Sequence, residues 1–288
     1  MSTEEILKLL FCIFLAFVPA IAWGIIFYKK HPKSKKMILA TFIGGCFTVV
    51  PILLYQMSLE RELDMMFFTI RFRDMLDFFG NIKEKNFYKS VVLTYMFVGV
   101  LEEFFKHSIV KIMDDDKIES VDDAIELSIV AALGFAFVEN IMYFFNIWNT
   151  AGNINALFVP FIFRSVFSTF AHILFSGVFG YYYGVAHFAH PFLQAEEKEG
   201  KHPVIKFVHK VLHLKKDTLY HEEKIMEGLL LAILLHAGFN FSLEVGWIFV
   251  LVPYLFLGFY FLSQLLERKE NHVRYKMVTE VRTSVIGS

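Results

Sequence analysis

The sequence is poor in cysteine and has no excess of either charge. Its two cysteines, Cys12 and Cys46, lie in apolar segments, which argues against a disulfide framework and against a thiolate metal site. The formal net charge is -1, so no basic surplus indicates a nucleic-acid partner. The amino terminus lacks the basic region and cleavage site of a removable signal peptide, and we expect the first apolar segment to be retained.

Several motifs that identify hydrolases are missing as well. The sequence has no His-Glu-x-x-His run, no Gly-x-Ser-x-Gly elbow, no phosphate-binding glycine loop and no paired aspartates within apolar segments. No internal repeat or low-complexity segment is evident. These absences exclude the protease and nucleotide-binding classes that those motifs define.

Apolar residues make up 56% of the 288 residues, and aromatic residues make up 17%. A typical soluble domain is about 45–50% apolar, so the composition indicates an integral membrane protein. A spanning helix needs about 20 mostly apolar residues. We predict an all-α, polytopic transmembrane helix bundle, formed by residues 1–288 as a single domain, with about seven spans at about 6–28, 37–59, 88–112, 124–147, 157–189, 225–243 and 246–266.

Basic residues gather in three places, at 29–36, at 198–224 and after residue 266. With seven spans these regions fall on one side of the membrane, and the positive-inside rule makes that side the cytoplasm. We therefore expect an outside amino terminus, a cytoplasmic carboxyl terminus and a multi-pass location in the cell membrane. Amphipathic patterns predict an outer surface segment at 60–87 and an interfacial helix at 204–214 within a cytoplasmic loop, 190–224.

Ionisable and polar residues interrupt four of these apolar segments. Each charge at the centre of a spanning helix costs about 2.5–3.5 kcal/mol, so such side chains are expected to face one another inside the bundle. Counted from the cytoplasmic ends at about 1.5 Å per residue, the acids and histidines lie about 16–24 Å deep, which places them near one layer. The candidates are Glu102, Glu103 and Lys106; Glu139 and Asn140; Arg164, His172 and Ser176; and His236 and Asn240.

The spacing suggests partners for some of these groups. Glu102 and Lys106 stand four residues apart in the order that favours an intrahelical ion pair, whereas Glu103 lies on a second stripe of the same helix. Arg164 lies toward the same half of the membrane as Glu139 and is its candidate counter-ion. Simple neutralisation of buried charge is an alternative to a functional role for both pairs. It explains two adjacent glutamates less well, because they repel each other.

Carboxylates, imidazoles and an amide at one depth suit hydrolysis in two ways. A glutamate can activate water as a general base while imidazole and amide groups stabilise the oxyanion. Alternatively, Glu103, His172 and His236 can hold a divalent metal such as zinc. The spacing alone does not choose between the two.

The polar residues also form an ordered series of motifs over about residues 88–245. The motifs are Glu102-Glu103-Phe104-Phe105-Lys106, Phe135-x-x-x-Glu139-Asn140-x-x-Tyr143, His172-x-x-x-Ser176 and His236-x-x-x-Asn240. This series resembles the PrsW family of bacterial intramembrane proteases, which belongs to a larger group with the CAAX prenyl endopeptidases and the CPBP proteins. Residues 88–245 are therefore the expected catalytic core.

The resemblance implies an intramembrane endopeptidase that cleaves a membrane-anchored protein, typically a single-pass anti-sigma factor cut at the first site of a regulated cascade. It implies Glu102 and Glu103 as the catalytic pair, His172 and His236 as essential residues, and Asn240 as support for the oxyanion. The motifs leave metal and glutamate-activated water open, and the relatives favour water. Supporting roles are expected for Lys106, Glu139, Asn140, Arg164 and Ser176.

Two other functions fit a buried polar group in a membrane bundle. A distant relative keeps paired histidines for assembly, so a non-catalytic scaffold subunit is one alternative; it would tolerate Glu102→Gln, whereas a protease would lose turnover. A proton-coupled transporter is the other alternative, because buried acids and histidines also build proton relays. The absence of inverted repeats argues against the transporter.

Overall fold

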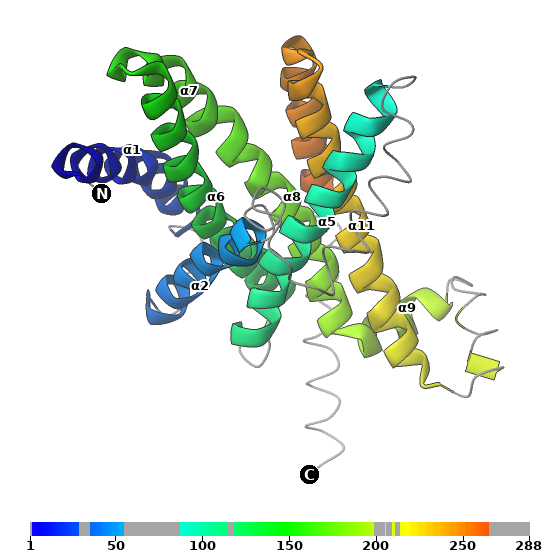
Figure 1. Ribbon diagram of the computed structural model, residues 1–288. Helices are drawn as coiled ribbons and strands as arrows, with labels where there is room; N and C mark the ends of the chain where they lie inside the picture. Colours follow the sequence, from blue (N-terminus) through cyan, green and yellow to red (C-terminus); the bar gives the residue numbers. More distant parts are fainter. Residues whose placement is uncertain are drawn as a thin grey trace.

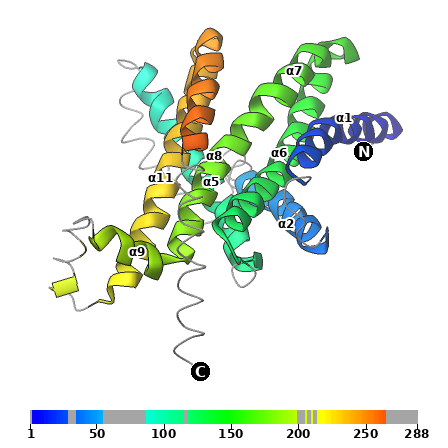
Figure 2. The same cartoon turned by 180° about the vertical axis from the view of Figure 1, so that it is seen from behind.

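The computed structural model describes residues 2–28, 35–54, 87–114, 118–198, 205, 209–210 and 214–264. Over these residues the chain is helical, with short turns and no strand, as the sequence predicts. Residues 60–86 of the amphipathic segment expected at 60–87, and most of the interfacial helix expected at 204–214, lie outside the described residues. The helices form a splayed bundle with α8 (Thr169–His187) between α6 (Val121–Ala151) and α11 (Lys216–Glu244) in both views (Figures 1 and 2).

Each of the seven predicted spans contains helix. Five helices within the described residues are long and apolar enough to cross a membrane: Thr3–Ile25, Lys35–Leu54, Val121–Ala151, Ile154–His187 and Lys216–Glu244. Helix α5 (Phe87–Asp114) has the length but carries Glu102, Glu103 and Lys106 in its middle, and the helix Ile248–Gln264 is shorter. The chain is thus a multi-pass helical membrane protein, and seven spans and the orientation remain predictions.

Helices α6 and α8 form the buried centre of the bundle, and α1 (Thr3–Tyr28) and α2 (Lys35–Phe47) pack against α6. Small residues make these contacts close. A Cβ atom on Gly134 of α6 would lie 2.0 Å from the Phe42 carbonyl oxygen of α2, and one on Gly180 of α8 would lie 2.7 Å from the Ile125 Cα atom of α6. Gly180 is therefore a close-packing position, because no larger residue fits there without moving the backbone.

The ends of α6 are defined by local hydrogen bonds. Ser120 and Asp123 form a capping box: the Asp123 amide donates to the Ser120 hydroxyl over 3.2 Å, and the Ser120 amide donates to the Asp123 carboxylate over 3.0 Å. Gly152 ends the helix with a φ of 70°, a backbone conformation that favours glycine. These signals fix the register of the helix that carries Glu139 and Asn140.

The long fifth predicted span is a broken helix. It starts with a 3-10 turn, Ile154–Leu157, continues through α7 (Phe158–Phe163) and a π-turn (Arg164–Ser168), and becomes α8. Part of the length of the span predicted at 157–189 is therefore taken up by non-α structure. Helix α9 (Ala189–Lys198) follows α8.

Candidate active site

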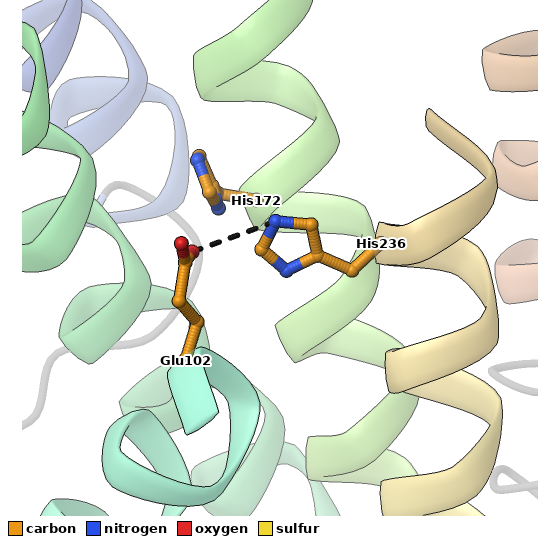
Figure 3. A group of neighbouring side chains, drawn as sticks. All are labelled: Glu102, His172 and His236. Carbon is orange, nitrogen blue, oxygen red and sulfur yellow. Dashed lines mark ion pairs between the residues drawn. The ribbon is translucent and has the colours of Figure 1, made fainter. Parts of the chain in front are cut away.

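Three side chains from three different helices meet inside the bundle. Glu102 of α5, His172 of α8 and His236 of α11 each offer one ligand atom, and these atoms lie within 4.8 Å of one another. All three residues are buried, with exposed fractions of 9%, 4% and 2%. Figure 3 shows the Glu102 carboxylate facing the His236 ring, with His172 above both. The expected convergence of acids and histidines from separate spans is confirmed for this set.

The His236 imidazole bridges the two adjacent glutamates of α5. Its Nδ1 atom lies 2.7 Å from Glu103 Oε1, and its Nε2 atom lies 3.4 Å from Glu102 Oε2. A carboxylate can only accept, so the close Nδ1 contact carries the proton, and Nε2 faces Glu102 with its lone pair. The Phe175 ring stacks on the imidazole at 5.1 Å between centroids and restricts its rotation.

Lys106 pairs with Glu103 and not with Glu102. The Lys106 ammonium donates to Glu103 Oε1 over 2.5 Å, and both side chains are fully buried. The spacing predicts the i,i+4 pair with Glu102, but the i,i+3 neighbour is equally within reach on a helix, and Glu102 turns toward α11. Lys106 Nζ also lies 3.4 Å from His172 Nδ1 and 4.7 Å from the Phe135 ring centroid.

The second histidine is held from α6. His172 Nε2 lies 3.0 Å from Glu139 Oε2, and the same oxygen lies 2.6 Å from Arg164 Nη2. Arg164 is thus the counter-ion of Glu139, as expected from the sequence. Arg164 Nε also donates to Asn140 Oδ1 over 2.6 Å. Glu139, Asn140 and Arg164 thus form one polar group directly behind His172.

The remaining candidates lie one helical turn beyond a site histidine. Ser176 is fully buried on α8, and its hydroxyl has no hydrogen-bond partner among the described residues. Asn240 is half-buried on α11, four residues after His236. The sequence reading omits His107 from the site, yet its Nε2 atom lies 3.3 Å from Glu103 Oε2 and its ring stacks on Phe179. The i,i+4 spacing of Glu103 and His107 is the signal that could have found it.

The donor set fits a divalent metal such as zinc. Two ligands of a tetrahedral site with bonds of about 2.0–2.1 Å stand about 3.3–3.4 Å apart, and His236 Nε2 and Glu102 Oε2 are 3.4 Å apart. Glu102 Oε2 is buried and has no hydrogen-bond partner among the described residues, which leaves it free to bind a cation. Histidines that bind a metal usually donate their other ring N–H to a carboxylate, as His236 does to Glu103.

The geometry favours Glu102 as the candidate carboxylate ligand, whereas the sequence suggests Glu103. Glu103, the sequence-based candidate, accepts from Lys106 and from His236 Nδ1 at its Oε1 atom. Glu102 Oε2 has no hydrogen-bond partner among the described residues and lies 3.4 Å from His236 Nε2. With neutral histidines, the three carboxylates Glu102, Glu103 and Glu139 face the two cations Lys106 and Arg164. One negative charge is left over, which favours a cation in this buried place.

Comparisons with known proteins agree with this chemistry. The family model described as PrsW family intramembrane metalloprotease matches residues 33–265, which include the whole site. A protease PrsW from Oceanobacillus iheyensis is 25% identical over 246 residues, covering 83% of this chain and 86% of the relative. Those from Shouchella clausii (27% over 234 residues, 80% and 81%) and Geobacillus kaustophilus (33% over 164 residues, 56% and 58%) are also similar. No solved structure matches the chain.

Proposed function

The chain belongs to the PrsW family of intramembrane proteases, and we propose that it hydrolyses a peptide bond of a membrane-anchored protein with the help of a divalent metal. The observation that supports the metal is the meeting of Glu102, His172 and His236, with a buried, unpartnered carboxylate oxygen among them. When bound, such a metal supplies Lewis acidity toward a peptide carbonyl and toward water.

We assign the other buried groups to holding this site in place. Glu103 accepts from His236 Nδ1 and thereby points Nε2 toward Glu102. Lys106 neutralises Glu103, because a second carboxylate beside Glu102 would otherwise repel it. The Asn240 amide, one turn from His236, is the group that we propose to donate to the developing oxyanion, and such a donor contributes about 100-fold to 1,000-fold in rate. Ser176 supports the packing around His172.

A glutamate-activated water is the alternative mechanism within the same function. The unpartnered Glu102 oxygen also suits a general base, and His236 Nε2 is close enough to hold the same water. In this case the protein hydrolyses its substrate without a metal, and Glu102 becomes the group that takes the proton. Sensitivity of the activity to a chelator separates the two mechanisms.

For the substrate we propose a single-pass membrane protein, with an anti-sigma factor as the first candidate, cut at the first site of a regulated cascade. This assignment comes from the motif resemblance, and the location that goes with it is the cell membrane. The buried position of the site on α5, α8 and α11 supports a substrate that reaches the protease from within the bilayer.

The test is cleavage of a single-pass reporter by the purified protein in detergent, with and without a chelator. Glu102→Gln, His172→Ala and His236→Ala are each expected to lose more than about 100-fold in kcat, above the 10–100-fold that an outer hydrogen-bond partner contributes. Matched controls are Glu4→Gln and His190→Ala, which change exposed residues outside the site. Full activity of the three site variants would overturn the assignment, and chelator-resistant activity would select the glutamate-activated water.

A further inference from the structure

The π-turn that precedes α8 has a geometric consequence for the site. In residues Arg164–Ser168 the backbone takes one more residue per turn than an α-helix, and the amide and hydroxyl of Thr169 both donate to the Arg164 carbonyl oxygen. Single π-turns inside α-helices occur frequently at functional sites. Here the turn lies between two residues that contact the same carboxylate.

Arg164 and His172 are eight residues apart, which in a regular α-helix at about 100° per residue would place them about 80° apart around the axis. The extra residue of the π-turn takes up about 100° of that rotation, so the two side chains come to within about 20° of each other. The contacts agree with this alignment. Arg164 Nη2 and His172 Nε2 both reach Glu139 Oε2, at 2.6 Å and 3.0 Å.

The guanidinium of Arg164 is fixed on several sides. Its Nε atom donates to Asn140 Oδ1, the Asn140 amide nitrogen lies 3.4 Å from Thr169 Oγ1, and the Tyr143 ring covers the guanidinium at 4.5 Å. A carboxylate held by such a group has one orientation, and it accepts from His172 Nε2. The contact therefore sets the tautomer of His172 and leaves Nδ1 as the acceptor nitrogen, which faces the Lys106 ammonium at 3.4 Å.

The same arrangement occurs twice around the site. His236 has one nitrogen on Glu103, which is paired with Lys106, and His172 has one nitrogen on Glu139, which is paired with Arg164. Glu103 and Lys106 belong to α5, whereas Glu139 belongs to α6 and Arg164 to the π-turn, so the two arrangements form independently. Each imidazole is held by a carboxylate that is itself held by a cation.

We propose that Glu139 is a positioning residue that orients His172, and that the π-turn serves to bring Arg164 into line with His172 so that both act on Glu139. This inference rests on the proposed function only in that His172 belongs to the reacting site. A purely structural role would require the ion pair to do no more than neutralise two charges inside the membrane.

The double variant Glu139→Leu/Arg164→Met separates the two roles. Arg164 is buried and Glu139 is partly exposed. Replacement of both partners by apolar residues of similar size leaves no uncompensated charge and is often neutral or stabilising, so the variant is expected to fold. If the pair positions His172, zinc affinity and kcat fall by about 10–100-fold while KM changes little. Lys224→Met/Glu227→Leu, which removes another ion pair on α11, is the control that leaves both unchanged.

A readout without metal or substrate keeps this test independent of the proposed reaction. In isotope-labelled protein, the ring nitrogens of His172 are expected to report one tautomer in the wild type and a mixture in the double variant. Wild-type zinc affinity, kcat and tautomer in the double variant would overturn the proposal. A wild-type protein that binds no zinc would defeat the metal mechanism alone, because kcat and the tautomer still measure positioning.

The π-turn is tested by changing the register at Val166, a residue that is 51% exposed on the bundle surface. Deletion of Val166 leaves Arg164 seven residues from His172, about 20° away in a regular α-helix, so the contact with Glu139 and most of the activity are retained. Insertion of one alanine after Val166 rotates Arg164 by about 100° and is expected to match the loss of the double variant. Equal effects of deletion and insertion would refute the alignment.

Discussion

Replacement of each of the two adjacent glutamates of α5 by glutamine should affect a different property of the protein: its stability for Glu103, and its zinc binding and cleavage for Glu102. Both changes remove one negative charge at nearly the same depth, so the net charge of the site changes identically. The partners differ, however: Glu103 accepts from Lys106 over 2.5 Å and from His236 over 2.7 Å, whereas Glu102 Oε2 has no hydrogen-bond partner among the described residues.

Glu103→Gln leaves the fully buried Lys106 ammonium without its counter-ion. Breaking a buried pair by removal of one partner costs about 3–5 kcal/mol of the free energy of unfolding. Glu102→Gln removes no such pair and takes away a buried charge that lacks a counter-ion, so we expect it to leave the free energy of unfolding unchanged or to raise it. It nevertheless removes the carboxylate that we propose as the metal ligand, so zinc binding and cleavage are expected to be lost.

The assay is unfolding in detergent by a denaturant titration, together with zinc affinity and reporter cleavage for the same preparations. Glu103→Gln/Lys106→Met removes both charges and serves as the rescue variant: its stability should return toward the wild type. Equal destabilisation by Glu102→Gln and Glu103→Gln, or unchanged zinc affinity in Glu102→Gln, would refute the division of roles between the two residues.

Three further predictions follow from the site and the packing. Removal of the metal with a chelator is expected to abolish cleavage, and zinc at about 100 times its Kd should restore it and stabilise the fold by about 2.7 kcal/mol, measured as a shift in thermal unfolding. Asn240→Ala is expected to lower kcat by about 100-fold to 1,000-fold with little change in KM, and an unchanged kcat would exclude the amide from the oxyanion site. Gly134→Ala places a Cβ atom 2.0 Å from the Phe42 carbonyl oxygen and should destabilise the fold by about 1–3 kcal/mol, whereas Gly24→Ala, with open space around it, is the control.

Hydropathy alone predicts most of the architecture because every spanning helix must satisfy its backbone internally. It locates the helices, including α5, whose three central charges would remove it from a strict search for apolar spans. The cost of charge in the bilayer then predicts that the acids and histidines meet, and Glu102, His172 and His236 do so. The Arg164 pair with Glu139 is predicted from depth alone and is present at 2.6 Å.

Pairing within the site could not be read from the sequence. Residues three and four positions apart are equally near on a helix, so the choice of Glu103 over Glu102 by Lys106 depends on what α11 presents, namely the His236 ring between the two carboxylates. The π-turn cannot be predicted from the sequence for a related reason. Its hydrogen bonds are local, but the alignment of Arg164 with His172 is stabilised by Glu139 on another helix.

The charge of the site explains why the two glutamates are not redundant. Lys106 and Arg164 neutralise Glu103 and Glu139, and each of these carboxylates holds a histidine. Glu102 is then the carboxylate whose charge no side chain of the group cancels by direct hydrogen bonding. A buried uncompensated charge is costly, and the protein can recover that cost only when a cation or a proton binds at Glu102. The same charge imbalance that destabilises the folded protein therefore favours the binding of a cation or a proton at Glu102.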